Sequence, residues 1–418
     1  MDTNNISVDL NDFIYSISLA LDLAESCALK DKNKKINFET PVPSFSVQSH
    51  DFANHSKRTA LVSLMIAKKL GFSDIDYKNL YIASFLHDIG AVEAFSICHS
   101  DSNFMYEHSE FGADIVSRLP VESTISDYIR YHHENPDGSG PNNLVGSDIP
   151  QISNIIHLAD MFELMYNDRL PYWAQKKEIM EWIVANRGIL FSFDEVDAFI
   201  DVAQAERFWL DVENISSNFE ILSRISPPIS APMTLDTLTD ISAVFAAIID
   251  KKSAFTHDHS IGLSEYASRF SEYYGFDSQK STKLKIAALL HDIGKLSIPN
   301  YILDKPGKLT NGEFTIIKSH TYYTRLILEK IKGMKEISEW ASNHHETLRG
   351  TGYPEGIGAD MLSFESRIIT VCDIYQALTE ARPYREGMPK SKAMKIINSL
   401  VEKGDVDSIV FKGLEEII

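Results

Sequence analysis

The feature that most constrains this chain is a pattern of histidines and aspartates that occurs twice, in the same order. Each copy contains a histidine, a His-Asp pair, another histidine, a His-His pair and a distal aspartate. The first histidine precedes the His-Asp pair by 32 residues in both copies. Ten of the fourteen histidines lie in the pattern. Because imidazoles and carboxylates are the ligands of borderline divalent metals, the pattern predicts a duplicated metal site.

The candidate ligands fall into one set per half of the chain. The N-terminal set is His55, His87, Asp88, His108, His132, His133 and Asp160. The C-terminal set is His259, His291, Asp292, His320, His344, His345 and Asp373.

Composition excludes several classes of protein. A formal net charge of −19 disfavours long nucleic acid as a partner, whereas a small anionic ligand is compatible with a metal centre. Cys27, Cys98 and Cys372 lack the paired spacing of a disulfide framework or a thiolate zinc site. No apolar run approaches the roughly 20 residues that span a bilayer, and the N-terminus lacks a signal-peptide pattern. We therefore expect a cytoplasmic protein that does not contact a membrane.

Most of the chain has the apolar spacing of amphipathic helices, for example over 55–71, 237–255 and 391–404, which predicts an all-α protein. Gly71, Gly275 and Gly404 follow such segments, where helix C-caps favour glycine. The prolines of ISPPISAP cannot lie inside a helix, so this segment predicts a linker. The expected division is a domain over 1–224, a linker over 225–232 and a domain over 233–418.

The offset between the two copies changes by eight residues at one place and by one further residue before the distal aspartate. It is 204 residues up to the His-Asp pair and 212 from the next histidine to the His-His pair. The shift lies in IPNYILDKPGKLTNGEF, which contains its own turn signals, and duplication followed by a loop insertion explains it. Residues 1–45 and 170–224 carry no metal motif and predict extra helices around the N-terminal domain.

Adjacent residues favour a site with two ions. Side chains at neighbouring positions of a helix diverge by about 100°, so a His-Asp or His-His pair does not chelate one ion as an i, i+4 pair does. Such pairs can flank two ions, with one carboxylate between them. This geometry is typical of dinuclear hydrolases, whose metals lie about 3.5–4 Å apart.

Four segments carry a family resemblance: HDIGK (291–295), KPGKLT (305–310), HHETLRGTGYPEGI (344–357) and DIYQALTEARPYR (373–385). They resemble the signature of HD-GYP phosphodiesterases, a branch of the HD superfamily of metal-dependent phosphohydrolases. The resemblance covers residues 237–400, and the N-terminal half resembles a decayed HD domain. It implies two tandem HD-type helical bundles and hydrolysis of a cyclic dinucleotide, 3′3′-cGAMP or cyclic di-GMP, to a linear dinucleotide.

The resemblance also implies roles for single residues. The seven C-terminal candidates would be metal ligands, with Asp292 bridging two ions such as iron or manganese. Lys295 would bind a phosphate oxygen and, with Asp292, make up the catalytic pair. Tyr353 would belong to the Gly-Tyr-Pro loop and contact substrate, while Arg382 and Arg385 would hold the phosphodiester.

Two departures from the family pattern bear on the C-terminal site. Relatives with three metals carry a glutamate where this chain has Phe255, so we expect two metals. Arg349 replaces an aspartate of the motif and places a cation near the substrate.

The N-terminal half keeps the ligands and loses much of the rest. Ala91 stands where the lysine belongs, and Pro141-Asn142 replaces Tyr-Pro. Arg169 is a candidate phosphate contact, and Asp51 occupies the place of a carboxylate for a third metal. We expect a half that binds metal without catalysis and acts as a regulatory or dimerising domain.

Two other functions remain open on the sequence alone. One is hydrolysis of a monomeric nucleotide, as in other HD proteins, and the other is a non-catalytic sensor of a cyclic dinucleotide. The Gly-Tyr-Pro loop and the paired arginines favour the cyclic substrate over the first, and Lys295 with the full ligand set argues against the second. The resemblance and the extra N-terminal helices also suggest a homodimer.

Overall fold

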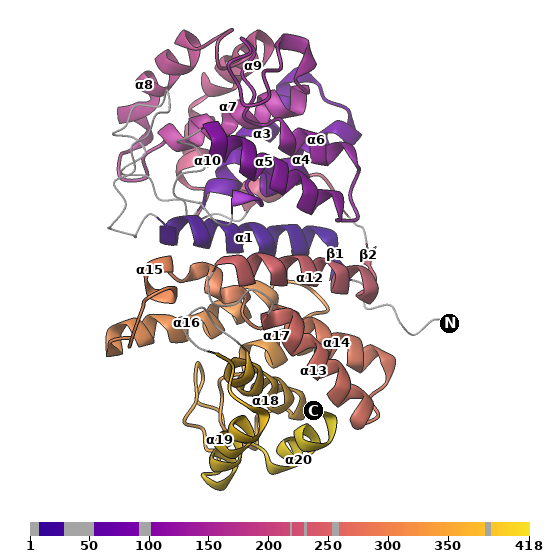
Figure 1. The fold of residues 1–418 in the computed structure, drawn as a ribbon. Coiled ribbons are helices and arrows are strands. Elements are labelled where there is room, and N and C mark those ends of the chain that lie inside the picture. The colour runs from indigo at the N-terminus through magenta and orange to yellow at the C-terminus, as the bar shows by residue number, and fades with distance from the viewer. Residues whose placement is uncertain are drawn as a thin grey trace. The chain divides into compact units, whose positions relative to one another are not determined.

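The computed structural model describes residues 8–28, 54–91, 102–217, 220–229, 232–252, 259–380 and 386–418 (Figure 1). In these residues nearly every element is a helix, and the sheet consists of two strands of two residues each. The all-α class predicted from the periodicity is therefore confirmed. No helix in this part of the chain is both long and apolar enough to cross a bilayer.

The described residues fall into two compact units. One lies within 17–230, and the other combines the residues up to 16 with those from 231 onward. Strand β1 (Val8–Asp9) pairs antiparallel with β2 (Pro232–Met233), so that Val8 faces Met233. The beginning of the chain therefore completes the C-terminal unit.

Helix α1 (Leu10–Ala28) follows β1 directly. The N-terminal unit then contains α3 (His55–Leu70), α4 (Asp74–Leu86), α5 (Ser102–Ser117), α6 (Thr124–Arg130), the 3-10 turn η3 (Gly146–Asp148), α7 (Gln151–Met165), α8 (Tyr172–Ala185), α9 (Phe193–Ala203), α10 (Glu206–Glu213) and α11 (Glu220–Ser223). The C-terminal unit contains α12 (Leu235–Lys252), α13 (His259–Tyr273), α14 (Ser278–Leu290), η4 (Ile293–Ser297), α15 (Asn300–Leu303), α16 (Asn311–Leu328), α17 (Lys335–Ser342), α18 (Phe364–Thr379), α19 (Lys390–Glu402) and α20 (Ser408–Ile417).

Five helices recur in the two units and carry the repeated pattern. Helices α3 and α13 begin at the first histidine, and α4 and α14 end directly before the His-Asp pair. Helices α5 and α16 contain the next histidine, α6 and α17 end just before the His-His pair, and α7 and α18 contain the distal aspartate. The short helix α15 lies in the segment that was predicted to be the insertion.

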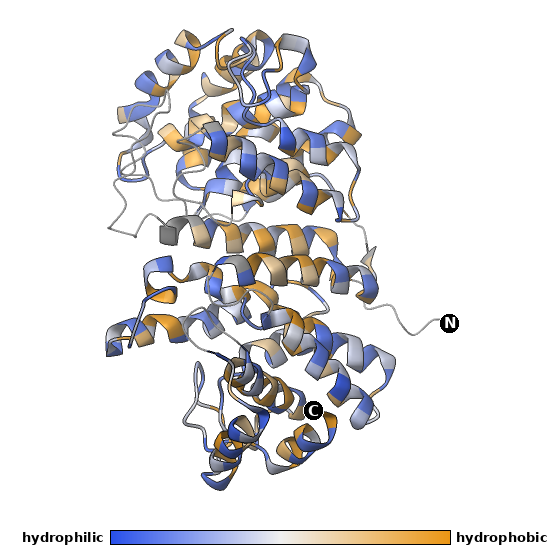
Figure 2. Ribbon diagram, in the orientation of Figure 1, coloured by the Kyte–Doolittle hydropathy of each residue, from blue (hydrophilic) through white to orange (hydrophobic). Residues whose placement is uncertain are grey.

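The helices form where the sequence has amphipathic patterns and capping residues. Figure 2 shows apolar and polar residues interleaved along most helices, and α12 is largely apolar. Thr310 and Glu313 form a capping box at the start of α16, which satisfies backbone N–H groups that the first turn leaves unpaired. Gly71 closes α3 with φ of 75°, in the left-handed region that glycine adopts without strain.

A close backbone approach positions the His-Asp turn in each unit. A Cβ atom at Gly294 would overlap the carbonyl oxygen of His320, and a Cβ atom at Gly90 would overlap that of His108. The turn after the His-Asp pair therefore packs directly on the helix that bears the next histidine. The Thr324 hydroxyl strengthens this approach in the C-terminal unit, because it accepts from the N–H of Gly294 at 3.1 Å and donates to the carbonyl of His291 at 2.9 Å.

We expect Gly294→Ala to destabilise the protein by about 3 kcal/mol, because overpacking against a rigid backbone forces the turn away from α16. Gly312→Ala is the matched control, since a Cβ atom there meets no atom within 4 Å. Urea unfolding followed by circular dichroism measures both variants. Equal stability of the two variants would contradict the close approach.

Candidate metal centres

Helix ends and helix faces position the C-terminal cluster. His259 is the first residue of α13, and His291 directly follows the last residue of α14. His320 and Asp373 project from the interiors of α16 and α18. Because these groups are attached to packed helices rather than to free loops, their mutual geometry is rigid.

Two groups of potential ligands lie side by side in this cluster. His259, His291 and Asp373 form the first, with one potential ligand atom of each residue within 4.8 Å of the others. His320, His344 and His345 form the second by the same measure. The Nε2 atoms of His320 and His344 are 3.3 Å apart. Each group offers the nitrogen-rich ligand set that suits a borderline divalent ion.

Asp292 lies between the two groups. Its Oδ2 atom is 3.1 Å from Nε2 of His291, and its Oδ1 atom is 3.5 Å from Nε2 of His320. One carboxylate oxygen therefore faces each group, as a bridging ligand requires. The surrounding groups hold the pKa of this carboxyl well below its ordinary value: burial raises it, but His291 and Lys295 lower it more.

Backbone anchors set the orientation of most imidazoles. In both units the Nδ1 atoms lie 2.6–2.9 Å from a carbonyl oxygen three or four residues earlier, so each ring donates from Nδ1 and keeps the Nε2 lone pair for a metal. The anchored rings are those of His87, His108, His132, His291, His320 and His344. Burial lowers the pKa of His320 to about 3, so this imidazole is neutral at neutral pH.

His259 differs because carboxylates hold both of its nitrogens. Nε2 is 3.2 Å from Asp373 and Nδ1 is 3.2 Å from Glu380. Burial lowers the pKa of His259, but these two carboxylates outweigh burial and raise it to about 9. A carboxylate behind a ligating histidine fixes the ring and increases its basicity toward a metal.

Lys295 is close to the bridging position. It lies in η4, and its Nζ atom forms an ion pair with Asp292. Its side chain as a whole is 23% exposed, so Lys295 lies at the edge of the cluster. Burial lowers the pKa of Lys295, but Asp292 raises it above the ordinary value, so the group is positively charged.

The Gly-Tyr-Pro loop lies beside the second ligand group. The ring of Tyr353 lies 4.9 Å from that of His345, and Lys318 lies 5.3 Å from the tyrosine ring. The carboxylate of Glu346 accepts hydrogen bonds from the N–H groups of Glu355 and Gly356 at 2.7 and 3.0 Å, which holds the loop beside the His-His pair.

Of the three arginines predicted to contact the substrate, only Arg349 lies in the described part of the chain. Arg349 is half exposed, and its Nε donates to Asp405 at 2.7 Å, so its charge is already paired. Arg382 and Arg385 lie outside the described residues, as do Phe255 and Asp51.

The N-terminal cluster assembles all seven of its predicted ligands. His55, His87 and Asp160 form one group, and Asp88, His108, His132 and His133 form the other. As in the C-terminal unit, the two oxygens of the His-Asp carboxylate face different groups: Oδ2 of Asp88 is 3.3 Å from His55, and Oδ1 is 3.4 Å from His108.

The two clusters differ in their exposure to solvent. The C-terminal cluster is open on one side, where the side chains of His345 and Asp373 are 30% and 14% exposed. The corresponding His133 and Asp160 are 3% and 0% exposed. Ala91 is also buried, at the position that Lys295 occupies in the other unit. Among the described residues, the N-terminal cluster therefore has the potential ligands, all of them buried, and an alanine at the position of Lys295.

Carboxylates outside the repeated pattern support the first histidine of each unit. Glu163 is 2.7 Å from Nδ1 of His55 and also accepts from the buried Arg58 at 2.7 Å. The spacing offered a signal, because Glu163 is one helical turn after Asp160 on α7, and Arg58 is one turn after His55 on α3. The support from Glu380 had a weaker signal, seven residues after Asp373.

Comparisons with known proteins agree with this geometry. The HD domain family matches residues 43–189 and 243–410, one stretch in each half of the chain. The chain is 29% identical to 3′3′-cGAMP-specific phosphodiesterase 1 of Vibrio cholerae, over 86% of each protein. It is 33% identical to 3′3′-cGAMP-specific phosphodiesterase 3 of the same organism, over 73% of this chain and 66% of that one. A crystal structure of a cyclic GMP-AMP-specific phosphodiesterase of V. cholerae, V-cGAP3, superposes with a TM-score of 0.67 at 25% identity and 98% coverage of both chains.

We expect Glu380→Ala to weaken metal binding at the C-terminal centre about 10- to 100-fold, because His259 loses the carboxylate that orients its ring. Glu380→Gln is the control, since its amide oxygen can still accept from Nδ1. Titration of metal-free protein with Mn²⁺ against a competing chelator measures the affinities. A Glu380→Ala variant that retains the wild-type affinity would show that Glu380 does not support the site.

Proposed function

The chain belongs to the HD domain family, and from this premise we propose that its C-terminal half hydrolyses a 3′–5′ phosphodiester bond of a cyclic dinucleotide. The observation that carries the proposal is the open ligand cluster with a charged Lys295 at its edge. The relatives that cover most of the chain are named for 3′3′-cGAMP, so we propose this nucleotide as the preferred substrate and cyclic di-GMP as the alternative.

Two divalent ions such as iron or manganese fit the C-terminal residues. His259, His291 and Asp373 would hold one ion, His320, His344 and His345 the other, and Asp292 would bridge them. Bound ions of this kind lower the pKa of water and polarise phosphoryl oxygens. The donor set suits several metals and does not select one of them.

The chain's own residues would bind and orient the substrate. Lys295 would leave its ion pair with Asp292 and donate to a phosphate oxygen as negative charge develops there. Tyr353 would pack a base or ribose against the open side of the cluster, since its ring lies beside His345. Arg382 and Arg385 would hold the phosphodiester, and Arg349 would have to leave Asp405 to reach it.

The N-terminal cluster would bind metal without catalysing the reaction. Its ligand geometry repeats that of the other half, but it is closed to solvent and has Ala91 in place of a lysine. All seven of its potential ligands are buried.

Incubation of the purified chain with Mn²⁺ and either cyclic dinucleotide, followed by chromatography, should yield a linear dinucleotide. Asp292→Asn should abolish turnover, because the bridging carboxylate is lost. The matched Asp88→Asn variant changes the corresponding residue of the closed cluster and should retain turnover within a few fold. Absence of a linear product from both substrates would reject the proposal. An equal loss of turnover in the two variants would reject the assignment of the activity to the C-terminal half.

We expect Lys295→Ala to lower kcat about 10²- to 10³-fold, as for removal of one donor that stabilises transition-state charge. Lys285→Ala, on the exposed side of α14, is the control and should retain wild-type kcat. Steady-state assays of the preferred substrate measure both. An unchanged kcat in Lys295→Ala would show that Lys295 takes no part in the reaction.

A further inference from the structure

An aromatic rim borders the open side of the C-terminal cluster. It consists of Phe314 and Lys318 on α16 and Tyr353 of the Gly-Tyr-Pro loop. The ring of Tyr353 lies 4.9 Å from that of His345, the most exposed ligand of the cluster, and 6.4 Å from that of Phe314. A nucleotide whose phosphate lies at the ligands can therefore extend its base along Tyr353 to Phe314.

Phe314 offers an aromatic face to a ligand. The residue is 45% exposed, although its ring packs against that of Tyr353 at an interplanar angle of 84°. An exposed aromatic side chain beside a ligand cluster can serve as a stacking platform, because every base has a flat face that can lie on it. Phe314 therefore provides a place for a base but does not by itself select which base.

Lys318 supplies hydrogen-bond donors at the same place. Its Nζ atom lies 4.9 Å from the centre of the Phe314 ring and 5.3 Å from that of Tyr353, within the roughly 6 Å of a cation–π contact. Glu313, the one acidic residue of α16, pairs with Lys305 instead, and Lys318 forms no ion pair with any described residue. The ammonium group is therefore held beside two rings and keeps donors for a ligand.

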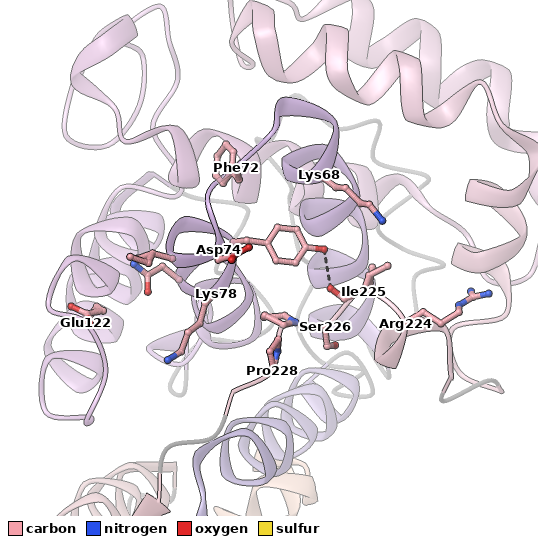
Figure 3. Close-up of a pocket in the computed structure, with 13 residues that line it drawn as sticks. Lys68, Phe72, Asp74, Lys78, Glu122, Arg224, Ile225, Ser226 and Pro228 are labelled. Atoms are coloured by element: carbon pink, nitrogen blue, oxygen red, sulfur yellow. Dashed lines mark hydrogen bonds between the residues drawn. The ribbon is translucent and has the colours of Figure 1, made fainter.

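The aromatic rim differs in charge from a hollow of about 670 Å³ in the N-terminal unit (Figure 3). The charged residues that line this hollow are Lys68, Lys78, Arg224, Asp74 and Glu122. Arg224 pairs with a carboxylate of α10 at 2.9 Å, and the two lysines are balanced by the two acids of the lining. The hollow therefore favours no ligand of either charge, whereas the rim has a cation without a balancing carboxylate.

An ammonium group beside a stacked base discriminates between the two purines. Guanine presents two acceptors, O6 and N7, at one edge, whereas adenine presents the acceptor N7 and the donor N6–H there. Lysine has three donors and no acceptor, so it satisfies the guanine edge and meets a second donor on adenine. The two substrates proposed for the C-terminal half, 3′3′-cGAMP and cyclic di-GMP, both contain guanine.

We propose that the aromatic rim is a guanine subsite of the C-terminal site. The guanine stacks on Phe314 with its ribose beside Tyr353, and Lys318 donates to O6 and N7 while the phosphodiester lies at the metal ligands. The assignment rests on the proposed phosphodiesterase function and goes beyond it, because it names the residue that selects the base. One guanine satisfies the subsite, so both proposed substrates are accepted and cyclic di-AMP is disfavoured.

Lys318→Met tests the contact with the base, because it removes the donors and keeps an unbranched side chain against the two rings. We expect KM for cyclic di-GMP to rise about tenfold, and the preference in kcat/KM for cyclic di-GMP over cyclic di-AMP to fall by a similar factor. Lys318→Arg should retain the preference, since arginine also donates to O6 and N7 of guanine. The full chain with Mn²⁺ and a mixture of the two nucleotides, followed by chromatography of the linear products, measures the preference.

Phe314→Leu tests the stack. We expect KM to rise about tenfold for both nucleotides, because stacking on an aromatic ring does not depend on which base is present. Tyr273→Leu and Lys330→Met are the controls and should keep wild-type kinetics. Tyr273 is 49% exposed on α13, and Lys330 is exposed after the end of α16. Thermal melts report the folding of each variant.

Three results would overturn the guanine subsite. The first is a wild-type chain that does not prefer cyclic di-GMP over cyclic di-AMP. The second is an unchanged preference in Lys318→Met, and an equal loss on both nucleotides would then assign Lys318 to a phosphate. The third is a wild-type KM in Phe314→Leu. Failure of the phosphodiesterase function itself is distinct, because the wild-type chain would then yield no linear product from 3′3′-cGAMP or cyclic di-GMP.

Discussion

The rest of the structure depends on the burial of charged and imidazole groups at the two clusters. The N-terminal unit buries five imidazoles and two carboxylates of its cluster, and the C-terminal unit buries four imidazoles and the carboxylate of Asp292. Such burial is unfavourable unless the groups are paired, hydrogen-bonded or bound to metal. Three features of the structure meet this requirement. Backbone carbonyls anchor the Nδ1 atoms, helix ends bear the histidines, and glycines let the His-Asp turn approach its neighbouring helix.

The two units have diverged in what surrounds the ligands rather than in the ligands. Lys295 supplies a cation at the open edge of one cluster, whereas the small, buried Ala91 stands at the corresponding position of the other. The first histidine is supported by Glu380 in one unit and by Glu163 with the buried Arg58 in the other. Duplicated ligands therefore do not imply duplicated chemistry, because access and local charge decide what a cluster can act on.

The sequence predicted the helical class and the members of both clusters, because a helix end and its neighbouring ligands are encoded locally and repeat at near-constant spacing. The pairing of Arg349 with Asp405 could not be predicted, since the partners are 56 residues apart and the motif alone suggested a substrate contact. The burial of the N-terminal cluster could not be predicted from the sequence either, because burial depends on how helices that are distant in the sequence pack.

The antiparallel pairing of β1 with β2 makes the C-terminal unit discontinuous in sequence. Phe13, near the beginning of the chain, packs against Phe245 of α12 at a ring distance of 5.8 Å. A fragment that begins after the proline-containing segment would therefore lack a strand and part of its core, although it would retain every candidate C-terminal metal ligand. In the order of the sequence, the N-terminal unit is an insertion within the C-terminal unit. The two units are therefore not independent modules joined end to end.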